Sequence, residues 1–330
     1  LLVTVGLAAC GTSSADDNAA GGSAEAETLR LGYFPNITHA LPLVGVQDGT
    51  YAKALGSTKL ETQIFNAGPA AIEALLSGSL DASYIGPNPA INAFVRSRGE
   101  AVRIVAGATS GGAFLVVRPD ITSPADLRGQ QLASPQLGGT QDVALRTWLA
   151  SQGLATDTAG GGDVSVVPQE NAQTLERFRD GKLAGAWVPE PWASRLVLEG
   201  GGKVLVDERD LWPGKQYTTT VLLVRRDFLE RHPERVLALL RGHVEATKWL
   251  VAHQDEARTR VNAVLEKLTG KPIGEAVMAR AFGSLTFSTD PQMASLAKSA
   301  ADAAALGLLK LDGVDLAPLH DPAPLQRALP

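Results

Sequence analysis

Residues 64–95 read IFNAGPAAIEALLSGSLDASYIGPNPAINAFV and contain the same strand-to-helix junction twice. In each copy the apolar end of a strand leads through Gly-Pro, at Gly68-Pro69 and Gly86-Pro87, into a helical pattern. A third junction with the same character lies at Gly138-Gly139-Thr140. After each glycine the apolar residues recur at i, i+3 and i+4, which predicts a helix with one face on a core. No Lys or Arg falls within GPAAI, GPNPAI or LGGTQD.

A helix start carries backbone N–H groups without intrahelical partners and a partial positive charge. Several starts that point into one cleft make an anion site without any charged side chain. The loops around the junctions supply neutral polar side chains: Asn66, Asn88, Ser110, Ser134, Thr140 and Gln141. Two interpretations remain open. The junctions bind an anion, or Gly-Pro simply begins helices well in this α/β chain.

Strand and helix patterns alternate over most of the chain, which favours an α/β fold with parallel sheets. The expected strands are residues 28–34, 60–65, 81–85, 102–106, 114–118, 131–133, 164–167, 183–188, 203–206 and 218–224. From Pro233, which suits the first position of a helix, the pattern is almost wholly helical.

The bulk composition fits a globular protein of two domains. The chain has 330 residues, of which 45% are hydrophobic and 20% charged. Its formal net charge of -5 argues against a nucleic-acid partner, because phosphate binding requires a basic surface. No apolar run after position 10 is long enough to span a membrane.

The N-terminal residues predict a lipoprotein. Leu7-Ala8-Ala9-Cys10 resembles a bacterial lipobox, in which the cysteine is acylated and anchors the protein to the membrane. Residues 1–10 are then a signal remnant, and the small, polar residues 11–27 form a flexible tether. The alternative is an N-terminal strand with a chance cysteine. Cys10 is the single cysteine, so no internal disulfide is expected.

The sequence lacks the motifs of common enzymes, cofactor sites and metal sites. It has no G-x-x-x-x-G-K-[ST], G-x-G-x-x-G, H-E-x-x-H or G-x-S-x-G. We therefore expect no cofactor and no metal. His39 follows the first strand, at the sheet end where α/β proteins bind ligands, and with Asn36 it is a candidate cleft residue. Tyr33 and Thr38 could wall the same cleft, and the alternative is that Asn36 or Thr38 serves only as a helix cap. The histidines after position 230 are expected on the surface.

The segment Gly185 to Trp192, GAWVPEPW, places a carboxylate between two tryptophans and two prolines. Trp187 either lines a cleft or belongs to a core. Glu190 is a candidate partner for a cationic group of a ligand. Asn171 and the threonines 218–220 are further candidate donors.

These segments together resemble the substrate-binding proteins of ABC importers in the sulfonate, taurine and nitrate group, which includes thiamine-pyrimidine-type binders. The resemblance rests on LRLGYFPNITHA, on the two Gly-Pro junctions, on ITSPADLRGQQLASPQLGGTQDVAL and on GAWVPEPWASRL. It implies a type II periplasmic-binding-protein fold, in which two α/β lobes are joined by two crossings near residues 115–119 and 218–224. Residues 28–114 and 221–330 would form lobe 1, and residues 115–220 lobe 2.

The resemblance also implies which residues hold a ligand between the lobes. Lobe 1 would supply Asn36, His39 and the helix starts at Gly68-Pro69 and Gly86-Pro87-Asn88. Ser110 and the turn Gly139-Thr140-Gln141 would close from the other side. Asn171 would add a donor, with Trp187 and Glu190 at the rim.

The leading hypothesis is an extracytoplasmic, lipid-anchored and monomeric binding protein. It would deliver a small organic anion, with an aliphatic sulfonate such as an alkanesulfonate or taurine first, to an ABC permease and its ATPase. Nitrate or a thiamine precursor is an alternative ligand. An enzyme of the thiamine-pyrimidine or small-anion lyase type on the same fold is an alternative class, and a sensor without import is a third.

Overall fold

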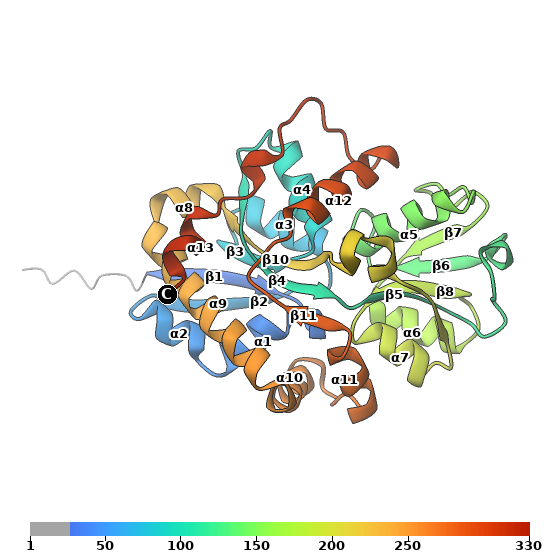
Figure 1. Ribbon diagram of the computed structural model, residues 1–330, viewed down its shortest axis with the longest axis horizontal. Coiled ribbons are helices and arrows are strands. Elements are labelled where there is room, and N and C mark those ends of the chain that lie inside the picture. Colours follow the sequence, from blue (N-terminus) through green and yellow to red (C-terminus); the bar gives the residue numbers. More distant parts are fainter. Residues whose placement is uncertain (1–26) are drawn as a thin grey trace, which may run out of the picture.

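The computed structural model describes residues 27–330, which fold into two α/β lobes side by side (Figure 1). Cys10 and nearly all of the predicted tether lie outside the described residues. Lobe 1 is built on a six-stranded sheet in the order β11-β4-β10-β3-β1-β2. Its strands are β1 (Thr28–Tyr33), β2 (Lys59–Ile64), β3 (Ala82–Ile85), β4 (Val102–Gly111), β10 (Thr218–Arg225) and β11 (Leu285–Phe287).

Lobe 2 is built on a five-stranded sheet in the order β7-β6-β8-β5-β9. Its strands are β5 (Ala113–Val117), β6 (Gln131–Ser134), β7 (Ser165–Pro168), β8 (Gly185–Pro189) and β9 (Lys203–Asp207). Its helices are α5 (Thr140–Ser151), α6 (Asn171–Arg179) and α7 (Trp192–Leu198), with short 3-10 helices at η2 (Pro124–Leu127), η3 (Glu208–Leu211) and η4 (Pro213–Lys215).

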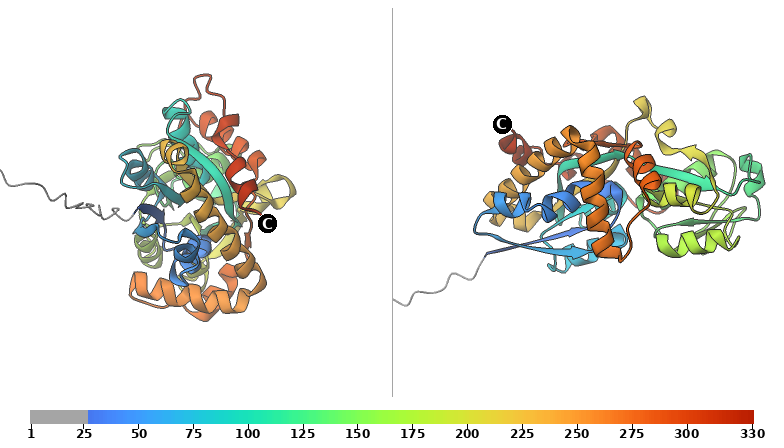
Figure 2. Two further views of the ribbon diagram at one scale, coloured as in Figure 1. Left: turned by 90° about the vertical axis from the view of Figure 1, so that its left-hand side faces the viewer. Right: turned by 90° about the horizontal axis from the view of Figure 1, so that it is seen from below.

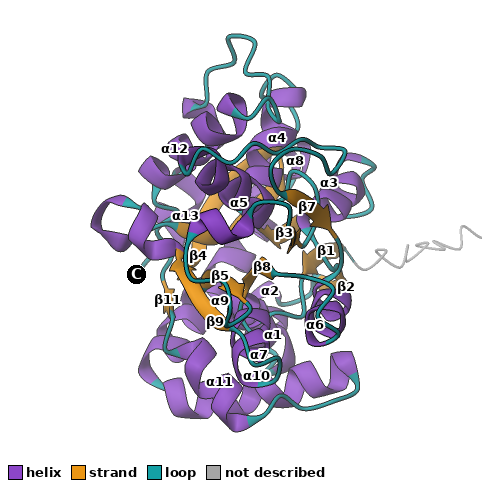
Figure 3. Ribbon diagram, turned by 90° about the vertical axis from the view of Figure 1, so that its right-hand side faces the viewer, coloured by secondary structure: helices purple, strands orange, loops and turns teal. Residues whose placement is uncertain are grey.

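Helices cover both faces of each sheet (Figures 2 and 3). Lobe 1 carries η1 (Ile37–His39), α1 (Ala40–Gln47), α2 (Thr50–Leu55), α3 (Gly68–Leu76), α4 (Pro87–Arg96), α8 (Arg226–Arg231), α9 (Pro233–Ala252), α10 (Gln254–Thr269), α11 (Glu275–Phe282), α12 (Met293–Ala305), η5 (Ala317–Leu319) and α13 (Ala323–Ala328). Among the described residues, no helix combines the length and the apolar character that crossing a membrane requires.

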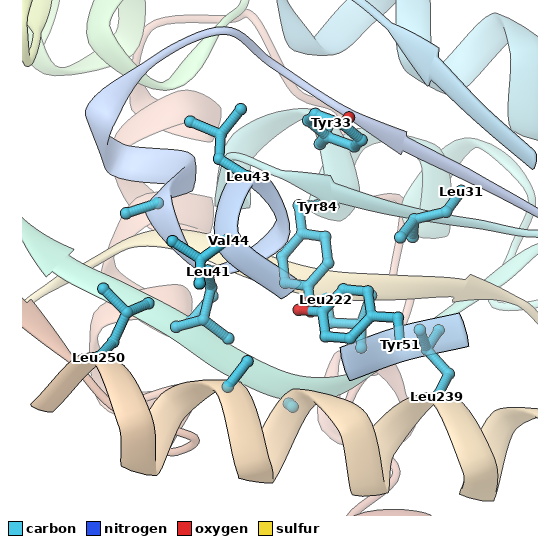
Figure 4. Packing of buried hydrophobic residues seen from close by; sticks show 14 of the residues in the cluster. Leu31, Tyr33, Leu41, Leu43, Val44, Tyr51, Tyr84, Leu222, Leu239 and Leu250 are labelled. Carbon is cyan, nitrogen blue, oxygen red and sulfur yellow. The ribbon is translucent and has the colours of Figure 1, made fainter. Parts of the chain in front are cut away.

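Side-chain alternation along the strands builds a core on each side of each sheet. In lobe 1, Leu29, Leu31 and Tyr33 pack with α1, α2 and α9 on one face, and α3, α4 and α12 cover the other (Figure 4). In lobe 2, Leu115 packs on the side of α5, and Phe114 packs on the side of α6 and α7. The glycine junctions are thereby placed at the strand ends that face the other lobe.

A row of hydrogen-bonded polar side chains lies inside the lobe 1 core. It includes His243, which was expected on the surface. The Tyr51 and Tyr84 hydroxyls lie 2.6 Å apart, and the Tyr84 hydroxyl lies 2.7 Å from Nδ1 of His243. His243 is fully buried on α9, and burial lowers its pKa to about 4. The prediction failed because one face of α9 packs on the sheet, and His243 falls on that face.

The chain changes sheets twice. Strand β4 belongs to the large sheet and β5 to the small one, so the first change falls at Gly112; the second falls between β9 and β10. The lobe boundaries at residues 114/115 and 220/221 remain a prediction beside these positions. The expected strands all have counterparts, and the short β11, which pairs with β4, was missed.

The expectation of parallel sheets is wrong in part. Strand β10 pairs antiparallel with β3 and β4, and β5 pairs antiparallel with β8 and β9. These antiparallel strands flank the two changes of sheet. Where the chain leaves one sheet and later returns to it, the strands run antiparallel to their neighbours. The local strand pattern of the sequence does not reveal this direction.

Candidate ligand-binding site between the lobes

A cavity lies between the two lobes, at the ends of their parallel strands. Its lining residues are Phe34, Asn36, Thr38, His39, Asn66, Ala67, Gly68, Gly86, Pro89, Pro135, Gln136, Gly139, Thr140, Gln141, Asn171, Pro189, Thr219 and Thr220. The space inside has a volume of about 40 Å3. A buried water needs roughly 10 to 15 Å3 on the same scale, so the cavity suits a group of a few heavy atoms.

Three helix starts contribute residues with N–H donors to this cavity. They are α3 in lobe 1 at Gly68, α5 in lobe 2 at Thr140 and Gln141, and α6 in lobe 2 at Asn171. The N–H groups of these residues make no hydrogen bond to another described residue. Donors and partial positive charge from both lobes therefore meet at one small cavity.

The start of α4 differs from this pattern. Gly86 and Pro89 line the cavity, but Pro87 and Pro89 have no N–H to donate. The remaining N–H in the first turn, that of Asn88, is directed at Oγ1 of Thr140 in the other lobe at 3.4 Å. The Asn88 side chain donates to the Ser299 carbonyl at 3.1 Å. The structure thus directs this start toward the opposite lobe and away from the cavity.

Two polar side chains of the cavity wall, Asn36 and Asn171, keep donors unused. Oδ1 of Asn36 accepts from Nε1 of Trp192 at 2.9 Å, while its Nδ2 has no partner among the described residues. The amide of Asn171 makes no side-chain hydrogen bond to a described residue, and its Oδ1 is buried. A buried amide oxygen without a partner lacks its hydrogen bond, so a bound ligand or water would satisfy it.

His39 is held as a neutral donor. Its Nδ1 accepts from the backbone N–H of Phe34 at 3.3 Å, and its ring stacks on Phe34 with centroids 4.4 Å apart. Because Nδ1 accepts, the proton of the neutral ring sits on Nε2. Burial lowers the pKa of His39 to about 3, so the imidazole stays uncharged at neutral pH.

The start of α5 is braced by a buried carboxylate. Asp142 accepts from Oγ of Ser134 at 2.7 Å, from the N–H of Gly138 at 3.0 Å and from Nε of Arg146 at 3.1 Å. Asp142 and Arg146 are 0% and 2% exposed, so their charges are paired away from the cavity wall. This network ties the end of β6, the glycine turn and α5 together.

The structure brings together eight of the fourteen predicted site residues. Asn36, His39, Gly68, Gly86, Gly139, Thr140, Gln141 and Asn171 line the cavity. Pro69 faces a neighbouring groove on α3 and α4, and Pro87 and Asn88 do not line the cavity.

Three further predictions place their side chains wrongly. Ser110 donates to the Tyr217 carbonyl at 2.7 Å and lines a polar crevice beside the lobe junction. Trp187 is fully buried in the lobe 2 core and donates to Glu208 at 2.7 Å, so it does not reach the rim. Glu190 is also fully buried, because the start of α7 folds back over it.

The carboxylate of Glu190 is satisfied by its own helix. It accepts from the N–H of Ser194 at 3.0 Å and from its hydroxyl at 2.9 Å. Burial raises the pKa of Glu190 to about 7, although the hydrogen bonds from Ser194 oppose the rise. Glu190 is therefore not available to a cationic group of a ligand in this arrangement.

Several lining residues were not predicted as site residues: Phe34, Ala67, Pro89, Pro135, Gln136 and Pro189. All of them flank a predicted residue by one to five positions, so extending each motif to its whole loop is the signal that was available. Thr219 and Thr220 line the cavity, but their hydroxyls donate to the carbonyls of Gly111 and Thr38 and thereby join strands.

Among the residues that the structure describes, His39 is the one ionisable side chain that lines the cavity. The described residues also contain no group of three or more His, Cys, Asp or Glu side chains that could hold a metal ion. The wall thus offers neutral donors and a few apolar surfaces from Phe34, Pro89, Pro135 and Pro189.

Two α/β lobes joined by two changes of sheet, with the cavity between them, define a periplasmic-binding-protein fold. The chain belongs to the NMT1-like family, whose profile matches residues 22–266. It is a member of the group of ABC substrate-binding proteins that includes sulfonate, taurine, nitrate and bicarbonate binders, which confirms the predicted resemblance, and the relatives that it matches are binding proteins and not enzymes.

Curated relatives are distant in sequence. The taurine-binding periplasmic protein of Escherichia coli is 29% identical over 238 residues, covering 70% of this chain and 70% of that protein. The bicarbonate-binding protein CmpA of a Synechococcus strain is 26% identical over 251 residues, which cover 68% of this chain and 54% of CmpA.

Solved structures confirm the fold. The alkanesulfonate-binding protein SsuA of Xanthomonas axonopodis bound to MOPS superimposes with a TM-score of 0.74 at 22% identity, covering 91% of this chain and 100% of that one. The periplasmic nitrate-binding protein NrtA of Synechocystis gives a TM-score of 0.75 at 19% identity, covering 92% of this chain and 88% of that one.

Proposed function

We propose that this protein captures a compact, permanently ionised organic anion outside the cytoplasm and delivers it to an ABC permease. An alkanesulfonate of one or two carbons is the leading ligand. The observation that carries the proposal is the set of unused N–H donors at Gly68, Thr140, Gln141 and Asn171, which come from both lobes and surround one cavity.

The donors favour an anion over a neutral ligand. Helix starts stabilise negative charge, and a low-dielectric cavity strengthens that interaction. His39 and the amides of Asn36 and Asn171 add neutral donors beside them. A group that stays ionised without proton exchange, such as a sulfonate, suits a wall that has no acid or base titrating near neutral pH.

The charged groups near the cavity favour binding of a simple alkanesulfonate over binding of taurine. Taurine carries an ammonium group, and a buried ammonium requires a carboxylate or several acceptors. No carboxylate lines the cavity, and Glu190, the residue first considered for that role, is bound to Ser194. The apolar surfaces of Phe34 and Pro89 suit a short alkyl group instead.

A second candidate ligand is nitrate or bicarbonate, which the small volume favours. About 40 Å3 holds a planar oxyanion without any tail. Relatives of this chain are named for nitrate and bicarbonate, so the family carries such ligands. The two candidates differ in whether the apolar part of the wall contributes to binding.

Delivery requires the protein to stay near the membrane and to present its ligand to a permease. Cys10 would carry the lipid anchor and residues 11–27 the tether. The permease and its ATPase would take the ligand when the lobes open.

Isothermal titration calorimetry with methanesulfonate, ethanesulfonate, taurine, nitrate and bicarbonate tests the proposal. We expect ethanesulfonate to bind at least about tenfold more tightly than taurine, because taurine buries an unpaired ammonium. Taurine binding more tightly than ethanesulfonate would contradict the assignment. Binding of nitrate alone would select the second candidate, and no heat with any of the five would remove the anion proposal.

A further inference from the structure

Among the hydrogen bonds that cross between the lobes near the cavity, one involves the side-chain amide oxygen of a residue in the cavity wall. Nε1 of Trp192, the first residue of α7 in lobe 2, donates to Oδ1 of Asn36 at 2.9 Å. Asn36 caps η1 in lobe 1, is 5% exposed and lines the cavity. The two residues are separated by 156 positions in the chain, so the bond depends on how the lobes sit together.

This bond fixes which end of the Asn36 amide faces the cavity. An indole Nε1–H can only donate, so the atom that it meets must be the carbonyl oxygen. Nδ2 of Asn36 is then left with no partner among the described residues. In this arrangement Asn36 therefore keeps both N–H groups of Nδ2 free to donate to a ligand, while its oxygen is engaged by Trp192.

The indole ring of Trp192 is itself held in place by neighbouring residues of lobe 2. The guanidinium of Arg195 lies 4.9 Å from its ring centroid, and Arg195 is bound to Glu199 at 3.1 Å. The carboxylate of Glu190 accepts from Ser194 and fixes the first turn of α7. The indole thus reaches Asn36 from a braced position, with little freedom to turn away.

We infer that Trp192 is a positioning residue for ligand binding, which turns Asn36 into an obligate donor when the lobes close. The inference rests on the proposed function. When the lobes separate, the bond breaks and the amide can rotate; when they close, Nδ2 is aimed at the ligand. A ligand atom beside Asn36 must then be an acceptor, as in a sulfonate or nitrate.

A double-mutant cycle between W192F and N36A tests this role, with methanesulfonate and nitrate as probes in calorimetry. Trp192→Phe keeps an aromatic ring and removes the N–H. We expect W192F and N36A each to weaken binding by about tenfold, the effect of one lost hydrogen bond. The double variant should be about as weak as N36A alone, because Trp192 acts through Asn36. Additive losses would overturn the inference.

The matched control is W249F. Trp249 on α9 also stacks under an arginine, with Arg260 4.5 Å from its ring centroid, but it does not line the cavity. We expect W249F to leave the affinity within about twofold, so that loss of any stacked tryptophan is not the cause.

The indole resonance of Trp192 separates failure of this inference from failure of the proposed function. In 15N spectra, N36A should shift this signal and speed its hydrogen exchange, in the presence or absence of an anion. An unchanged Trp192 signal in N36A would overturn the inference. Absence of anion binding in every variant, with the indole still sensitive to N36A, would instead overturn the proposed function and keep the bond between the lobes.

Discussion

The starts of α4 and α5 lie on opposite sides of one cavity and look alike in backbone geometry. Gly86 caps α4 at φ -69° and ψ 154°, and Gly139 caps α5 at φ -71° and ψ 167°. Their donors nevertheless have different fates. The N–H of Asn88 at the start of α4 points to Oγ1 of Thr140, while the N–H groups of Thr140 and Gln141 make no bond within the described protein.

The difference comes from the residues that follow each glycine. Two prolines in the first turn of α4 leave one donor, and a hydroxyl of the other lobe accepts it. The first turn of α5 has no proline and keeps its donors. The start of α5 therefore keeps free donors for the proposed anion, whereas the start of α4 makes a contact between the lobes.

The strongest test of this contrast adds a negative charge at the start of α5 and compares it with the same charge placed further along α4. Gln141→Glu places a carboxylate in the cavity, and we expect anion affinity to fall roughly 100-fold or more through like-charge repulsion at short range. Glutamate near a helix start is favourable for the helix, so the melting temperature should not fall.

Asn92→Asp provides the control, since it makes the same charge change on α4 outside the cavity. It should alter the affinity by less than about threefold, because a partly solvated charge outside the cavity is screened by solvent and salt. Equal losses in Q141E and N92D would show that overall charge, and not the α5 start, governs binding.

A proline at Gln141 makes the start of α5 resemble that of α4. Proline is tolerated in the first turn of a helix but removes the N–H. We expect Q141P to bind the anion about tenfold more weakly than Q141A, which loses the side chain and keeps the donor. Calorimetry on both variants, with circular dichroism to confirm folding, gives the comparison. Equal affinities would mean that this N–H contributes nothing.

A second comparison concerns folding stability and the buried carboxylates of Asp142 and Glu208. Asp142 at the start of α5 accepts three hydrogen bonds, whereas buried Glu208 accepts from Trp187 at Oε2 and its Oε1 has no partner among the described residues. Burial raises the pKa of Glu208 from 4.5 to about 7. The folded state therefore holds this proton more tightly than the unfolded state, and folding stability falls as pH rises from about 4.5 to 7.

Glu208→Gln removes this pH dependence. Relative to the wild type, E208Q should gain several degrees in melting temperature at pH 8 and little at pH 4.5, for up to roughly 3 kcal/mol of linkage. The control is E245Q, at an exposed position on α9. A constant difference between E208Q and wild type across this pH range would contradict the raised pKa.

The smallest expected effect is that of pH on anion affinity. His39 is the one ionisable side chain of the cavity wall, and burial holds its pKa at about 3, below the ordinary 6.5. It is neutral from pH 5 to 9, so the dissociation constant of a sulfonate should change by less than about twofold over that range. A loss of affinity as pH rises through 6.5 would show that a charged imidazole takes part.

The sequence predicts local elements well because their causes are local. The apolar alternation of β1 and the glycine junctions at Gly68 and Gly139 are visible in the chain and recur in the structure. Strand β11 was missed, since its three residues show no alternation and it exists by pairing with β4.

The errors at the site concern which atoms meet across long distances. The resemblance implied that Trp187 lies at the rim, but β8 is buried on both faces, so the alternative of a core position is the correct one. Glu190 was offered to a ligand, although Ser194 on the next helix already satisfies it. The bond from Trp192 to Asn36 joins two lobes, so no local pattern could reveal it.

Backbone amide spectra during titration with methanesulfonate measure the central claim most directly. The account predicts large shifts of the N–H signals of Gly68, Thr140, Gln141 and Asn171, which should move together at one affinity, while Asn88 shifts little because Thr140 already accepts its proton. Saturable binding that leaves those four signals unmoved would contradict the account.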